Sequence, residues 1–135
     1  NFKESKKILN DQNKKIFKRK KYYEDLLKLT ELSKKIISKE RFNLNKFGKL
    51  LDKNWRLKKK LSESISNNKI DNIYKKCLRH GAIGGKILGA GSGGFLLVAV
   101  NKNKKAKLIR FLKSYKIYSF SNSDKGVEVL YKIFY

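Results

Sequence analysis

The chain of 135 residues contains no proline and no methionine, and it has only one cysteine, one tryptophan and one histidine. A single cysteine excludes a disulfide framework within the chain, which fits a reducing compartment such as the cytoplasm. The chain starts at Asn1, and this start, together with the lack of methionine, predicts a fragment of a longer protein. The first residues are polar and rich in lysine, unlike a signal peptide, so a cytoplasmic location is expected.

Long hydrophobic runs are also missing. The longest apolar stretch, residues 87–100, contains four glycines, and it falls short of the roughly 18 to 20 residues that a membrane-spanning helix needs. No membrane partner is therefore expected. Hydrophobic residues still make up 40% of the chain, enough to predict a folded domain rather than a disordered one.

Acidic residues are scarce beside basic ones, and the formal net charge is +24. This charge suggests a polyanion partner such as nucleic acid. Arginine, whose planar guanidinium suits phosphate, is nevertheless rare beside lysine. A compositional bias therefore explains the charge better, and nucleic acid is kept as an alternative that is not expected to be physiological. The arginines are Arg19, Arg41, Arg56, Arg79 and Arg110.

The first 80 residues predict helices, because apolar residues recur there at helical spacing. Asn43 is expected to cap a third helix, and Asn68 a fourth one that stops at Gly81. Gly48 within the third helix is expected to be tolerated at some cost. The fourth helix has the clearest apolar stripe, formed by Ile70, Ile73, Tyr74, Cys77 and Leu78.

The second part of the chain predicts a sheet. Residues 82–88 and 95–100 have the composition of buried strands on either side of a glycine-rich turn. A helix over 102–115 should follow, with Ala106, Ile109 and Leu112 facing the core. Alternating residues over 117–121 and 127–133 predict two more strands. The expected fold class is α+β, an antiparallel sheet packed with helices.

The turn at residues 89–94 matches the pattern G-x-G-x-x-G, which is a weak signal alone. A dinucleotide-binding site needs a helix after the glycines, whereas a strand is expected here. A protein kinase would need a lysine where Asn101 stands, as well as H-R-D and D-F-G triplets, which the chain lacks. Two interpretations remain open from composition: close backbone packing, or a loop whose N–H groups approach phosphate.

Residues 81–97, GAIGGKILGAGSGGFLL, closely resemble the third conserved motif of the GHMP kinases, with Ser92 where that family usually has glycine. The approach to the motif, around Trp55, Lys58 and Ser62, is similar to that in the branch of D-glycero-D-manno-heptose 7-phosphate kinases and fucokinase-like proteins. The resemblance extends over 43–135. It implies a helical segment at 1–42 that continues from a missing N-terminal domain, followed by a ferredoxin-like C-terminal kinase domain at 43–135.

The resemblance also implies a function. The whole protein would be an ATP-dependent kinase of a sugar or sugar phosphate resembling heptose phosphate, with Mg and the phosphate loop coming with the missing N-terminal kinase domain. This chain alone is then expected to be inactive, whether it is a fragment, a split-gene subunit or a relic, and to hold no catalytic residue and no metal ligand. The residues expected near the nucleotide phosphates are Gly84, Gly85, Lys86, Gly89, Ala90, Gly91, Ser92, Gly93 and Gly94.

The other candidate residues have structural explanations. Cys77 and Trp55 are expected in the core, His80 at a helix end, and Asp71 near a helix start. Asp124 and Glu128 lie near an expected turn without a partner for paired-carboxylate chemistry. For Lys86, a role at the site, a salt bridge and exposure to solvent remain equally open.

Overall fold

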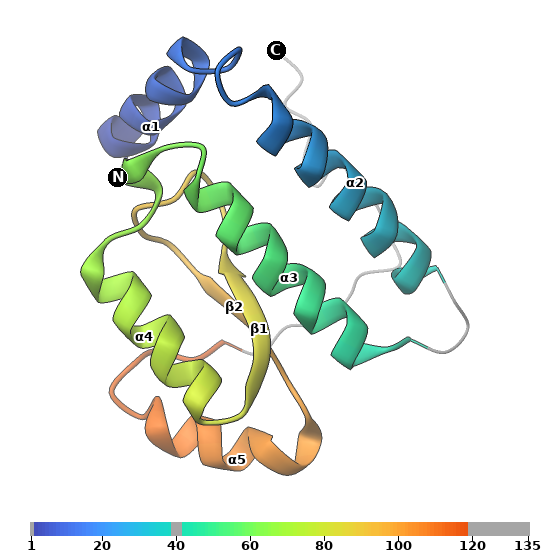
Figure 1. Cartoon of the computed structure of the whole chain (residues 1–135). Helices are drawn as coiled ribbons and strands as arrows, with labels where there is room; N and C mark the ends of the chain where they lie inside the picture. The colour runs from blue at the N-terminus through green and yellow to red at the C-terminus, as the bar shows by residue number, and fades with distance from the viewer. Residues whose placement is uncertain (1, 39–41, 119–135) are drawn as a thin grey trace, which may run out of the picture.

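The computed structural model describes residues 2–38 and 42–118, which form helices first and then a strand hairpin followed by a helix (Figure 1). The predicted α+β class is confirmed. The elements are α1 (Phe2–Lys14), α2 (Lys20–Ile37), α3 (Leu44–Lys59), a short 3₁₀ helix η1 (Glu63–Ile65), α4 (Asn68–Arg79), β1 (Ala82–Ile87), β2 (Leu96–Val100) and α5 (Lys102–Phe111).

The ends of α3 and α4 follow from local hydrogen bonding. The side chain of Asn43 accepts a hydrogen bond from the N–H of Lys46, which confirms the predicted cap of α3. The cap of α4 is Asn67, one residue earlier than predicted, because its side chain accepts from the N–H of Ile70. Gly81, at φ +97°, ends α4 as expected.

The hairpin of β1 and β2 is antiparallel, with Gly85 opposite Val98 and Ile87 opposite Leu96. Both strands were predicted to within one residue. Of the further strand expected at 117–121, Ile117 and Tyr118 lie in no regular element, and the rest falls outside the described residues. The strand expected at 127–133 lies entirely outside them.

Helix α3 packs directly on β1 through two glycines. A Cβ added to Gly84 would lie 2.0 Å from the carbonyl oxygen of Gly48, and one added to Gly48 would lie 2.8 Å from Ile83 Cγ2. Both distances are shorter than side-chain atoms tolerate. The glycine inside α3 therefore allows the helix and the strand to approach each other closely.

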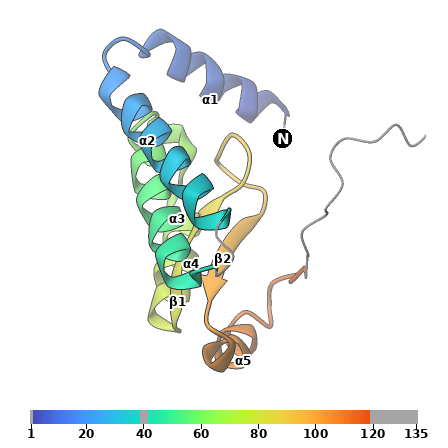
Figure 2. The same ribbon diagram turned by 90° about the vertical axis from the view of Figure 1, so that its right-hand side faces the viewer.

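The main hydrophobic core joins segments that are far apart in sequence. Trp55 of α3, Ile65 of η1 and Ile8 of α1 are all essentially inaccessible, and they belong to one cluster with Ile87 of β1. Helix α1 thereby lies beside the end of the hairpin that carries the glycine-rich turn, as Figures 1 and 2 both show. The predicted division into segments 1–42 and 43–135 stays a prediction.

Helix α5 presents a different face to the core from the one predicted. Leu108 is buried, and Phe111 and Leu112 pack beside it against Cys77 of α4. The expectation for Leu112 is thus correct, whereas Ala106 and Ile109 are exposed. Leu108, Phe111 and Leu112 stand at positions i, i+3 and i+4, so they share one face of α5. The exposed side of the helix carries lysines.

Candidate functional site

The glycine-rich loop of residues 88–95 joins β1 to β2, and its stem is closed by a hydrogen bond from the N–H of Leu88 to the Phe95 carbonyl, at 2.9 Å. Gly89, Gly91 and Gly94 have positive φ angles of 84°, 127° and 96°. An L-residue rarely adopts such angles. The loop therefore needs glycine for its backbone path, as well as for space.

The middle of the loop is tied to η1. The N–H of Ser92 donates to the Ile65 carbonyl at 2.7 Å, and the side chain of Asn67, the cap of α4, donates to the Ser92 carbonyl at 3.4 Å. Ser92 itself has φ +63°, so the serine adopts the left-handed conformation, which side chains other than glycine rarely adopt. A Cβ on Gly91 would lie 2.7 Å from the Ile65 oxygen.

Most N–H groups of the loop have no acceptor in the part of the chain that the structure describes. Apart from those of Leu88 and Ser92, the N–H groups of the turn find no hydrogen-bond acceptor among residues 2–38 and 42–118. Nothing lies within 4 Å of a Cβ placed on Gly89 or Gly93. An open turn with several free N–H groups is suited to receive the oxygens of an anion.

Two lysines lie at the base of the loop. The ammonium of Lys58, near the end of α3, donates to the Gly89 carbonyl. Burial and the neighbouring Lys86 ammonium lower the pKa of Lys58. Burial also lowers the pKa of Lys86 on β1. Within the described part of the chain, no carboxylate forms an ion pair with either lysine, so the salt bridge considered for Lys86 is not found.

Two of the nine predicted site residues have a packing role. Gly84 and Gly85 are buried in β1, where a Cβ on Gly85 would lie 2.3 Å from the Leu97 oxygen. The N–H of Gly85 donates to the Tyr74 hydroxyl at 3.1 Å, and that hydroxyl donates to Asp52 at 2.7 Å. These contacts join β1 to α3 and α4, which accounts for both glycines without a ligand.

The other sequence candidates lie away from the loop or have structural partners. Cys77 and Trp55 are fully buried, as predicted. His80 ends α4 and stacks on Phe111 at 4.1 Å between ring centroids. Asp71 accepts hydrogen bonds from Lys59 and Ser66, each at 2.9 Å. Asp124 and Glu128 fall outside the described residues, within which no group of three His, Cys, Asp or Glu could hold a metal ion.

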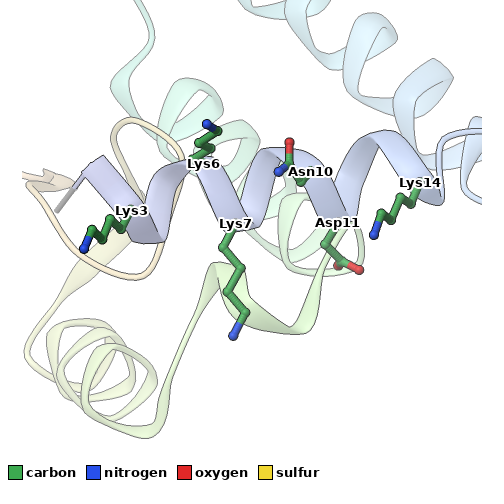
Figure 3. Close-up of a pocket in the computed structure, with 6 residues that line it drawn as sticks. All are labelled: Lys3, Lys6, Lys7, Asn10, Asp11 and Lys14. Atoms are coloured by element: carbon green, nitrogen blue, oxygen red, sulfur yellow. The ribbon is translucent and has the colours of Figure 1, made fainter.

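Two surface features border the loop. Leu88 and Phe95, at its stem, are exposed and lie at one end of an apolar groove along β2. A shallow hollow on α1 is lined by that helix alone, and its four lysines are spread along the helix and point in different directions (Figure 3). The hollow therefore has no opposing wall. No helix among residues 2–38 and 42–118 is long and apolar enough to cross a membrane.

Residues 24–117, well over half of the chain, match the family model described as the C-terminal domain of GHMP kinases. The chain belongs to the GHMP kinase family. The resemblance inferred from the glycine-rich segment is thereby confirmed, and the loop described above lies within the matched residues.

Curated relatives of this GHMP kinase domain include two kinases. The chain is 39% identical over 90 residues to the D-glycero-alpha-D-manno-heptose 7-phosphate kinase of Campylobacter jejuni, covering 65% of this chain and 26% of that protein. It is 44% identical over 66 residues to the mevalonate kinase of Methanocaldococcus jannaschii, covering 49% and 20%. The chain thus spans about a quarter of the first relative's length.

A solved structure supports the fold. The crystal structure of L. major mevalonate kinase in complex with R-mevalonate matches with a TM-score of 0.66 and 22% identity, covering 82% of this chain and 34% of that one. At this identity the match shows the fold alone. It agrees with the α+β arrangement of the GHMP C-terminal domain.

Sequence analysis did not identify Lys58 as a site residue, although it lies in the stretch that resembles the heptose phosphate kinases. Its contact with Gly89 joins positions 31 residues apart. The spacing of residues in α3 gives no sign of this contact, because a lysine on a helix is usually a solvated residue.

Proposed function

We propose that this chain supplies one wall of the active site of an ATP-dependent GHMP kinase, with the glycine-rich loop beside the nucleotide's phosphates. The observation that carries the proposal is the loop of residues 89–94, with its free N–H groups and, at its base, two lysines that have no carboxylate partner among the described residues. Free N–H groups and ammoniums both favour phosphate oxygens.

ATP fits the chemistry of these residues. The N–H groups of Gly89, Ala90, Gly91, Gly93 and Gly94 would face the phosphate oxygens, and Lys58 and Lys86 would add positive potential behind them. The described residues offer no metal cluster, so Mg is proposed to enter with the nucleotide and to be held by the N-terminal domain. When bound, ATP supplies the phosphoryl group.

The proposed acceptor is a sugar phosphate of the heptose 7-phosphate type. This proposal rests on the 39% identity to the Campylobacter jejuni kinase and on the similarity around Trp55 and Ser62. Phosphoryl transfer depends mainly on positioning and charge stabilisation. One wall cannot position both reactants, so the chain alone is proposed to be inactive and to require the N-terminal kinase domain.

The site on the chain can be tested with Mn²⁺·ATP, in which the paramagnetic ion marks the phosphate end of the nucleotide. At about 0.15 M salt, where exposed charges are screened beyond about 8 Å, we expect the amide NMR signals of residues 89–94 to broaden first. Binding should be weak, with a Kd of about 1 mM or higher, because half of the site is missing.

The exposed lysines of α1 and α5 provide the internal control for this titration. A general attraction of ATP to the +24 charge would broaden their amides as strongly as those of the loop. Broadening that follows lysine density rather than the loop would contradict the proposed site and favour the nucleic-acid alternative.

A further inference from the structure

We propose that Lys58 is the positioning residue of the glycine-rich loop: its ammonium holds the Gly89 carbonyl and so sets the path of the backbone whose free N–H groups would meet phosphate. This inference rests on the proposed function for its role in the kinase. The contact itself concerns the chain without any ligand.

The loop is held at its stem, at its middle and at Gly89, where Lys58 provides the contact. The stem has the hydrogen bond between Leu88 and Phe95, and the middle has the bond from Ser92 to the Ile65 carbonyl. The middle is bonded twice, because the Asn67 side chain also donates to the Ser92 carbonyl. Between stem and middle the chain turns through Gly89 and Gly91, both at positive φ. Without the contact from Lys58, the carbonyl of Gly89 would be free to rotate, because glycine restrains its own backbone least of all residues.

The position of Lys58 gives this contact its strength. Lys58 lies near the end of α3, and its ammonium is the charged donor of a solvent-exposed hydrogen bond to a neutral carbonyl. Hydrogen bonds that involve a charged group are stronger than neutral ones. Other lysines of α3 have different partners or none: Lys59 pairs with Asp71, whereas Lys53 is exposed.

Lys86 explains why the arrangement should also favour an anion. Lys58 and Lys86 are both half-buried, and burial together with repulsion from the Lys86 ammonium lowers the pKa of Lys58. Neither has a carboxylate partner within residues 2–38 and 42–118. A phosphate at the loop would reduce the repulsion between the two ammoniums. The Lys58 side chain would then both anchor the loop and attract the nucleotide.

The test compares K58M with K58R and K53M in the 135-residue chain. Methionine keeps most of the length of the side chain and removes its charge, whereas K53M removes a charge from an exposed site on the same helix. The readout is hydrogen exchange of the Ser92 amide, which reports loop order, against that of the Gly85 amide, which is bonded to Tyr74 in the core.

We expect K58M to accelerate exchange at Ser92 by about tenfold or more, the effect of losing one charged hydrogen bond, with Gly85 nearly unchanged. K58R should restore most of the protection, and K53M should behave as the wild type. Wild-type exchange in K58M, equal acceleration at Ser92 and Gly85, or failure of K58R to restore protection would each overturn the inference.

A second measurement separates this inference from the proposed function. Broadening of the loop amides by Mn²⁺·ATP should weaken at least about tenfold in K58M and persist in K53M. Faster exchange at Ser92 in K58M, combined with no broadening of the wild-type loop, would support the positioning role and contradict the kinase site. Unchanged broadening in K58M, with a broadened wild-type loop, would overturn the inference and leave the kinase site standing.

Discussion

Replacing Gly84 by alanine should lower the free energy of unfolding by at least about 3 kcal/mol, at the upper end of the usual cost of overpacking a core. The new Cβ would lie 2.0 Å from the Gly48 carbonyl oxygen and 2.8 Å from its carbonyl carbon. These atoms belong to the backbone of α3, so no flexible side chain can move aside. Helix and strand would have to separate, which would open the core around Trp55.

Urea denaturation followed by the fluorescence of Trp55, the only tryptophan, measures this loss. The urea midpoint should fall while the m-value stays the same. Gly93→Ala is the matched control, because nothing lies within 4 Å of its added Cβ and its φ is not positive. Its effect should stay within about 0.5 kcal/mol. Equal midpoints for the two variants would contradict the close packing of α3 on β1.

Replacing Gly91 by alanine should either destabilise the protein or displace the N–H groups of the glycine-rich loop. At φ +127° an alanine is strained by about 1–3 kcal/mol, and its Cβ would meet the Ile65 carbonyl oxygen at 2.7 Å. If the loop keeps its path, we expect a total stability loss of about 3 kcal/mol. If it moves, the loss is smaller, but the bond from Ser92 to Ile65 breaks and the N–H groups are displaced.

Either outcome has a measurable sign. If the loop keeps its path, urea denaturation shows the loss of stability. If the loop moves, the Ser92 amide should exchange rapidly, and the broadening of the loop amides by Mn²⁺·ATP should weaken at least about tenfold. K53M serves as the control for these readouts, because it changes an exposed lysine of α3. A G91A variant with wild-type stability, wild-type exchange at Ser92 and wild-type broadening would show that Ile65 does not fix the loop.

Much of the fold could be predicted from the sequence, because its signals are local. The cap at Asn43, the stop at Gly81 and both strands of the hairpin follow from hydrogen-bonding side chains, a positive φ angle and short apolar runs. The cap of α4 was predicted one residue too late, since Asn67 and Asn68 are equally good caps and only the geometry selects between them.

Contacts between distant segments could not be predicted in the same way. The core-facing residues of α5 were predicted as Ala106, Ile109 and Leu112. Leu112 does pack against the core, but Leu108 takes the place of Ala106 and Ile109, because several faces of this lysine-rich helix carry apolar residues. The role of Gly48 depends on Gly84, which is 36 positions away, and that of Lys58 on Gly89. Such pairs become visible only when the tertiary structure brings them together.

The central claim, that this chain completes a kinase active site through its glycine-rich loop, is tested most directly by a graft. The matched 26% of the Campylobacter jejuni heptose 7-phosphate kinase would be replaced by the corresponding residues of this chain, and ATP-dependent phosphorylation of the heptose 7-phosphate would be measured. We expect the graft to transfer phosphate, and the graft with G91A to be about 100-fold slower, while that with K53M, a change at an exposed lysine of α3, stays active. A folded graft without transfer, or equal rates for the three grafts, would contradict the claim.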